Sequence, residues 1–148
     1  MTKKRKTWAE KLQTGTPHIS ILEKPFCGLP IGCQLLISSP LEIQQFIQTQ
    51  IPLGHTLSPA QLRAKLAQRH LADATCPVST GIFLRIVAEN ACDELDQGKT
   101  LDQVCPFWRV IAPQSTTAKK LRVDSSWIEN VRLSETTAFY ASHSKLNQ

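Results

Sequence analysis

The sequence predicts a mainly α-helical domain with a short β element and a basic N-terminal extension. Two segments, residues 40–49 and 59–70, begin with proline after a serine and carry Glu or Gln three residues after that serine, which is a typical helix start. Residues 79–97 repeat apolar side chains at helical spacing, which indicates one long, deeply packed helix. Alternating patterns are short and lie within the first 38 residues.

The composition is that of an ordinary globular protein of one domain. The chain has 148 residues, which is long enough to bury a real core, and a formal net charge of +5. No apolar run approaches the roughly 20 residues of a membrane span. A secretory signal has an apolar segment after its basic start, and this sequence has none there. We therefore expect a cytoplasmic protein without membrane contact.

The cysteines and histidines show no pattern of a disulfide framework or a metal site. The five cysteines are an odd number without a C-x-x-C pair, and the four histidines are spread out. In a reducing compartment such thiols are most often small buried hydrophobes. We expect no metal and no cofactor.

The N-terminal extension covers residues 1–38. Residues 1–16 should form a basic arm with a helical turn or two around Trp8, ended by glycine and proline. A partial alternation predicts a strand over residues 18–22, and residues 34–38 are a candidate for a second strand.

The main domain covers residues 39–135. Proline and glycine in Ile51-Pro52-Leu53-Gly54 stop its first helix, and Gly98 ends the long one. Residues 100–104 are a candidate for one further helical turn.

The C-terminal part is predicted to hold one short helix. Ser126, with Glu129 three residues later, should open a helix over residues 126–133. Residues 136–148 have little to bury and are expected to form a frayed tail.

The stretch that organises the functional prediction is Cys105-Pro106-Phe107-Trp108-Arg109-Val110-Ile111. Aromatic residues are scarce elsewhere, so the adjacent Phe107 and Trp108 should either bury a ring or present one to a partner. The plainer alternative is that both rings fill the core after a turn.

This stretch resembles the Pro-Cys-His-Arg-Val signature of O6-alkylguanine-DNA alkyltransferases. Phe107 stands where the alkyl-accepting cysteine belongs, and Trp108 stands where its histidine belongs. Three further pieces resemble that family in the right order: Ile51-Pro52-x-Gly54, Ser58-x-x-x-Leu62, and residues 80–91 at the place of the recognition helix. Over residues 39–133 the resemblance implies a winged helix-turn-helix domain that binds duplex DNA through the minor groove.

The departures from the family concern its chemistry. A thiolate is the nucleophile in alkyl transfer, and neither Phe107 nor Trp108 can supply one or take its proton. Cys105 lies two residues earlier without a neighbouring histidine. Pro59 replaces a tyrosine of the family, Arg85 is the only candidate for its finger arginine, and residues 114–118 lack the glycines of its pocket loop.

The residue types suggest contacts for a polyanion, beginning with the basic residues 3–6. Arg109 could hold a phosphate or form a structural ion pair. Three acids on the long helix, Glu89, Asp93 and Asp96, oppose DNA along that face, so only its first turn and Arg85 should approach the backbone. The predicted DNA-binding residues are Ser79, Thr80, Arg85, Arg109, Lys119, Lys120 and Arg122, and Phe107 and Trp108 are the predicted pocket.

Three functions compete. The first is a non-catalytic, alkyltransferase-like protein that binds duplex DNA, reads alkylated or damaged sites and signals to a repair-protein partner. The second is a protein-interaction module that uses the Phe107–Trp108 edge after the fold has lost DNA binding. The third is an alkyltransferase with its nucleophile displaced to Cys105. The sequence leaves the oligomeric state open.

Overall fold

A computed structural model describes residues 4–144 of the chain, apart from the side chain of Ser144. Lys3 and residues 145–148, on which parts of the predicted basic arm and tail fall, lie outside the described residues. The described part contains five α-helices, three short 3-10 helices and one three-stranded sheet, which confirms the mainly α-helical class. Within it, no helix combines the length and apolarity needed to cross a bilayer.

The helices begin where local capping chemistry allows. Ser39 and Ser58 accept hydrogen bonds from the third amide of their helices, and proline occupies the first helical position in both. Thr7 and Glu10 form a complete capping box on the short first helix. The α-helices are α1 (Trp8–Leu12), α2 (Pro40–Gln50), α3 (Pro59–His70), α4 (Pro77–Asp96) and α5 (Ser125–Ser144).

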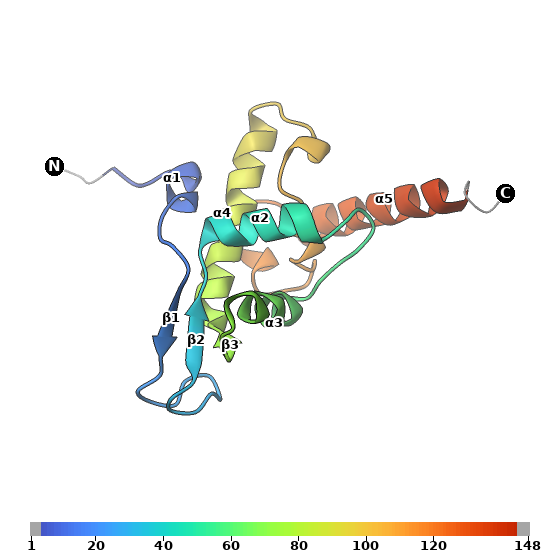
Figure 1. The fold of residues 1–148 in the computed structure, drawn as a ribbon. Helices are drawn as coiled ribbons and strands as arrows, with labels where there is room; N and C mark the ends of the chain where they lie inside the picture. The colour runs from blue at the N-terminus through green and yellow to red at the C-terminus, as the bar shows by residue number, and fades with distance from the viewer. Residues whose placement is uncertain (1–3, 145–148) are drawn as a thin grey trace.

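The sheet is small and lies beside the helices (Figure 1). Strand β1 (His18–Ile21) pairs antiparallel with β2 (Gln34–Ile37), with His18 opposite Ile37. Strand β3 (Ala74–Thr75), which the sequence did not indicate, pairs parallel with β2 and makes β2 the central strand. The three 3-10 helices are η1 (Leu101–Gln103), η2 (Phe107–Arg109) and η3 (Ala118–Lys120).

Helices α4 and α5 differ most from the sequence prediction. Helix α4 begins two residues early because Cys76 takes the cap position, where its thiol accepts a hydrogen bond from the Ser79 amide at 3.5 Å. Helix α5 is capped by Asp124, whose carboxylate accepts the Trp127 amide at 3.0 Å, instead of by Ser126. The prediction of a frayed tail from residue 136 is wrong as far as Ser144, because the helix continues through this segment.

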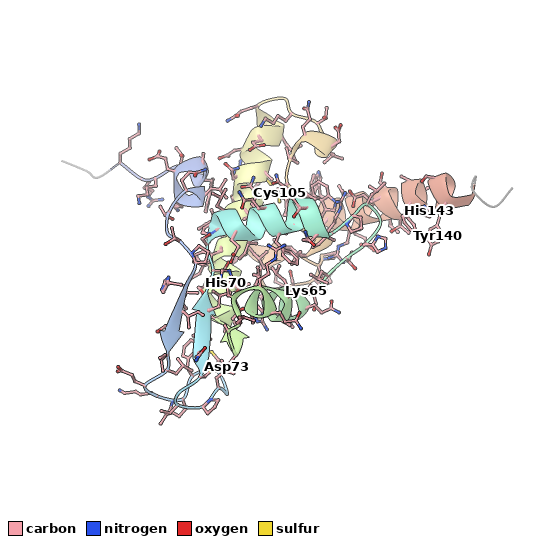
Figure 2. The ribbon with its side chains drawn as sticks, in the orientation of Figure 1. Lys65, His70, Asp73, Cys105, Tyr140 and His143 are labelled. Atoms are coloured by element: carbon pink, nitrogen blue, oxygen red, sulfur yellow. The ribbon has the colours of Figure 1, made fainter. Side chains whose placement is uncertain are left out.

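The distal half of α5 projects from the body, and Tyr140 and His143 lie on it (Figure 2). It is nevertheless tied to the loop between α2 and α3. His55 of that loop lies edge-on to Phe139, with ring centroids 5.1 Å apart. This contact with a distant loop supplies packing that the tail sequence alone does not reveal.

Candidate functional site

Phe107 and Trp108 lie in the hydrophobic core. Their exposed fractions are 0% and 1%, and neither ring lines any of the cavities described below. Trp127 of α5 completes the cluster: its ring stacks on Phe107 at 5.8 Å and meets Trp108 edge-on at 5.9 Å between centroids. Because the rings are covered by α5, they provide neither a wall for an extruded base nor an edge for a protein partner.

Arg109 forms the structural ion pair that was one of its two predicted roles. Its guanidinium donates two hydrogen bonds to the Glu135 carboxylate, each 2.8 Å long, and a third to the Ile51 carbonyl at 2.7 Å. The Arg109 carbonyl accepts the Leu57 amide at 2.8 Å. Arg109 thus holds both ends of the α2–α3 loop and fastens the loop to α5, which commits three of the five N–H donors of its side chain to the protein.

Cys105 is poorly placed to act as a nucleophile. Its side chain is 4% exposed and its sulfur lies 3.8 Å from the Gln44 carbonyl, against α2 (Figure 2). Burial raises the pKa of the Cys105 thiol well above its usual range, although the nearby Arg109 charge opposes this shift. A buried, protonated thiol is unreactive, so the geometry opposes a displaced alkyl acceptor at this position.

The first turn of α4 offers fewer polar contacts than the sequence suggested. The Thr80 side chain is 1% exposed and donates its hydroxyl hydrogen to the Cys76 carbonyl at 2.6 Å, so it cannot reach a phosphate. Ser79 is half-buried and its hydroxyl lies 3.5 Å from the same carbonyl. Of the two predicted contacts in this turn, only Ser79 retains some exposed surface.

The acidic residues of α4 are gathered by one arginine from the loop that precedes α5. Arg122 pairs with Glu89 at 3.2 Å, Asp93 at 2.8 Å and Asp96 at 3.0 Å. Desolvation disfavours its charge, but the hydrogen bond to Asp93 and the charge of Glu89 raise the pKa of Arg122 above its ordinary value. Arg122 is therefore committed to these carboxylates and is removed from the residues available to a phosphate.

Two of the predicted contacts, Arg85 and Lys120, meet at a cavity on the N-terminal half of α4, which we call the basic pocket. It has a volume of about 430 Å³ and lies where α1, α4 and the loop holding η3 come together. Lys11, Arg85 and Lys120 reach it from three separate segments, and none of its lining residues is acidic. The full lining is Trp8, Lys11, Val78, Gly81, Ile82, Arg85, Ile86, Thr117 and Lys120.

The wall of the basic pocket combines cations with apolar surface. The Lys11 ammonium lies 4.3 Å and the Arg85 guanidinium 5.5 Å from the centre of the Trp8 ring. The Nε atom of Arg85 is buried and has no hydrogen-bond partner among the described residues. Val78 and Ile82 line the same pocket and are 55% and 57% exposed. This arrangement suits an anion that carries an apolar or flat group.

The predicted contacts thus divide into two sets. Arg85 and Lys120 meet at the basic pocket, and Lys119 is exposed next to Lys120 but lines a neighbouring cavity. Trp8 and Lys11 were not predicted as site residues. Their one available signal was the basic, aromatic composition of the predicted helical turn in the arm.

Comparisons of the chain with protein-family models, curated proteins and solved structures gave no match. The resemblance to alkyltransferases therefore stays a prediction from the motifs in the sequence.

Proposed function

We propose that this protein is a non-catalytic, sequence-independent DNA-binding protein that holds duplex DNA at the basic pocket. The observation that carries the proposal is the meeting of Lys11, Arg85 and Lys120 around a cavity without a lining acid. Cations brought together from distant segments concentrate positive potential, and neutralising phosphates releases counterions from DNA. Lys4, Arg5 and Lys6, which immediately precede α1 and are exposed, extend the positive surface.

The charge distribution along α4 limits where DNA can lie. The basic pocket occupies the N-terminal half of the helix, where the helix dipole also favours anions. On the C-terminal half, Arg122 neutralises only part of the charge of three carboxylates. A phosphate backbone is therefore expected to cross the helix near Arg85 and to avoid Asp93 and Asp96.

The proposal includes a winged helix-turn-helix arrangement. In it, α3 and α4 would form the helix pair and the β1–β2 hairpin would be the wing. Because α1 packs on α4, its Trp8 and Lys11 would belong to the contact surface. We do not extend the proposal to alkylated bases, because the buried Phe107 and Trp108 offer no cavity for an extruded base.

The test is fluorescence anisotropy with a short labelled duplex over a series of salt concentrations. The test variant replaces Lys11, Arg85 and Lys120 by glutamine. The matched control replaces Lys24, Lys65 and Arg69 by glutamine, so that both variants lower the formal net charge from +5 to +2. Each lost phosphate contact should reduce the slope of log affinity against log salt by about 0.9, so the test variant should lose about 2.7.

The control variant is expected to keep nearly the wild-type slope. An equal loss in both variants would show that net charge alone drives binding, and no binding of the wild type at low salt would remove the proposal. A duplex containing O6-methylguanine should bind as tightly as the unmodified one. A preference of tenfold or more for the modified duplex would contradict the reasoning from the buried rings.

A further inference from the structure

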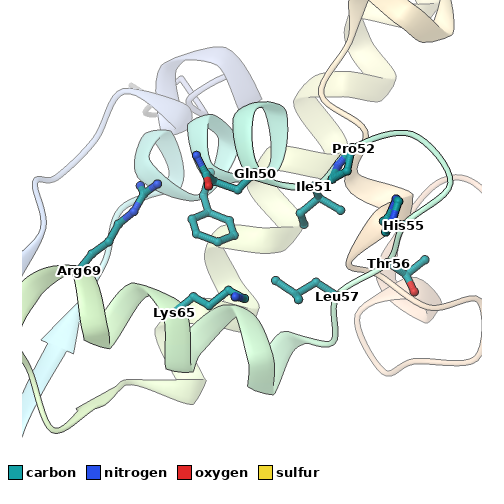
Figure 3. A pocket seen from close by; sticks show the side chains of 9 residues that line it. Gln50, Ile51, Pro52, His55, Thr56, Leu57, Lys65 and Arg69 are labelled. Carbon is teal, nitrogen blue, oxygen red and sulfur yellow. The ribbon is translucent and has the colours of Figure 1, made fainter.

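A second cavity, which we call the α2–α3 pocket, lies between the end of α2, the loop that follows it and helix α3 (Figure 3). Its volume of about 340 Å³ falls in the range of small-molecule sites. It is separate from the basic pocket and shares none of its lining residues. Its lining consists of Phe46, Gln50, Ile51, Pro52, His55, Thr56, Leu57, Lys65 and Arg69.

The α2–α3 pocket has an apolar floor and a cationic rim. Phe46 and Ile51 are buried and Leu57 is half-buried, whereas Lys65 and Arg69 are exposed and lie one turn apart on α3. The Arg69 guanidinium lies 4.9 Å from the centre of the Phe46 ring. In Figure 3 the Gln50 side chain comes from α2, and the Lys65 and Arg69 side chains come from α3 on the other side of the pocket.

The rim of the α2–α3 pocket carries two cations and no carboxylate, and Glu42 lines a neighbouring cavity together with Arg69. No residue that lines the α2–α3 pocket is acidic, and neither Lys65 nor Arg69 forms an ion pair within the part of the chain that the structure describes. Like charges at i and i+4 of a helix repel one another. A bound anion would relieve this repulsion, and a guanidinium can bind a carboxylate through two parallel hydrogen bonds.

The loop that closes the α2–α3 pocket is held in place before any ligand binds. Arg109 binds both of its ends, at the Ile51 carbonyl and the Leu57 amide. At its tip, Gly54 packs so closely on Phe139 that an added Cβ would stand 2.5 Å from the Phe139 Cβ. A preformed loop need not be ordered when the ligand binds, so less binding free energy is lost to conformational entropy.

We propose that the α2–α3 pocket binds a small carboxylate with a single aromatic or branched apolar group. The apolar group would lie over Phe46, Ile51 and Leu57, and the carboxylate would lie between Lys65 and Arg69. The ligand class follows from the cavity size, the apolar floor and the two unpaired cations. The proposal does not depend on DNA binding, because the two surfaces have no residue in common.

The experiment is a titration of the full chain, followed by two-dimensional NMR, with N-acetyl-phenylalanine as the probe. N-acetyl-phenylalaninamide tests the need for the carboxylate, and acetate tests the need for the apolar group. We expect saturable shifts at Gln50, His55 and Leu57 with the probe alone, and binding at least about tenfold weaker for the amide, the loss typical of a charge-assisted contact.

The variant Lys65→Gln/Arg69→Gln should weaken binding of the probe at least about tenfold. The control Lys11→Gln/Lys120→Gln removes the same charge from the basic pocket and should leave the affinity unchanged. Equal affinity for the probe and its amide, unchanged affinity of the Lys65/Arg69 variant, or no saturable shift would each overturn the proposal. A tetrapeptide that ends in phenylalanine identifies the source of the carboxylate: tight binding indicates a chain terminus, and weak binding a free small molecule, both with the same recognition.

Discussion

The substitution Gly54→Ala tests whether the distal half of α5 packs on the α2–α3 loop. Gly54 has φ +81°, and its added Cβ would stand 2.5 Å from the Cβ and 2.7 Å from the Cγ of Phe139. Gly15 is a matched control, because it has φ +78° and nothing within 4 Å of an added Cβ. The two substitutions therefore share the backbone strain and differ in the steric conflict.

The expected magnitudes follow from these two terms. Placing alanine in the left-handed region costs about 1–2 kcal/mol of folding free energy at either position. The added Cβ also conflicts with the Phe139 Cβ, which cannot rotate away because it is bonded to the backbone. Either α5 or the loop must therefore shift, which costs about 1–3 kcal/mol more. Gly54→Ala should thus destabilise the protein by roughly 1–3 kcal/mol more than Gly15→Ala.

Urea unfolding followed by circular dichroism gives both free energies. A double-mutant cycle repeats the Gly54→Ala measurement in a Phe139→Gly background. Glycine is used at position 139 because alanine would keep the conflicting Cβ. In that background the cost of Gly54→Ala should fall to that of Gly15→Ala. Equal costs for the two glycine substitutions in the wild-type background would refute the packing of α5 on this loop.

Two further predictions concern Arg109 and Cys105. Arg109→Gln should lower the free energy of unfolding by about 3 kcal/mol, because it leaves the half-buried Glu135 carboxylate without its partner. Arg109→Lys should recover part of this loss. An unchanged free energy in urea unfolding would contradict the role of Arg109 in fastening the α2–α3 loop to α5. Iodoacetamide at neutral pH should modify the exposed Cys27 in the native protein but not Cys105, whose burial raises its pKa, whereas urea should expose all five cysteines. Mass spectrometry measures the adducts, and equal native rates for Cys27 and Cys105 would show the central stretch to be open.

The features that were predictable from sequence depend on neighbouring residues. The Ser-Pro starts of α2 and α3 form the predicted caps, and the stop at Ile51-Pro52-Leu53-Gly54 falls at the end of α2. In each case the signal and the structure lie within a few residues of one another. The strand β3 gave no such signal, because its two residues are strand only through pairing with the distant β2.

The site was harder to predict because its residues come from distant segments. The residue types at Phe107 and Trp108 are compatible with both a core and a pocket. The structure places both rings in the core because Trp127, from a distant segment, covers them. Arg122 belongs by sequence to a basic cluster, yet it faces three carboxylates of α4 in space. Lys11 joins Arg85 only because α1 packs on α4.

Substitutions in the central stretch should therefore affect stability, and substitutions in the basic pocket should affect DNA binding. Every described polar contact of Arg109 is to the protein itself, and the rings beside it are covered, so changes there should alter the free energy of unfolding but not the duplex affinity of the folded fraction. Lys11 and Lys120 form no ion pair among the described residues, so their loss should do the reverse. Suppose that the folded Arg109→Lys variant lost as much duplex affinity as the Lys11/Arg85/Lys120 variant. The binding surface would then have to include the stretch that resembles the alkyltransferase signature, and the assignment to the basic pocket would be wrong.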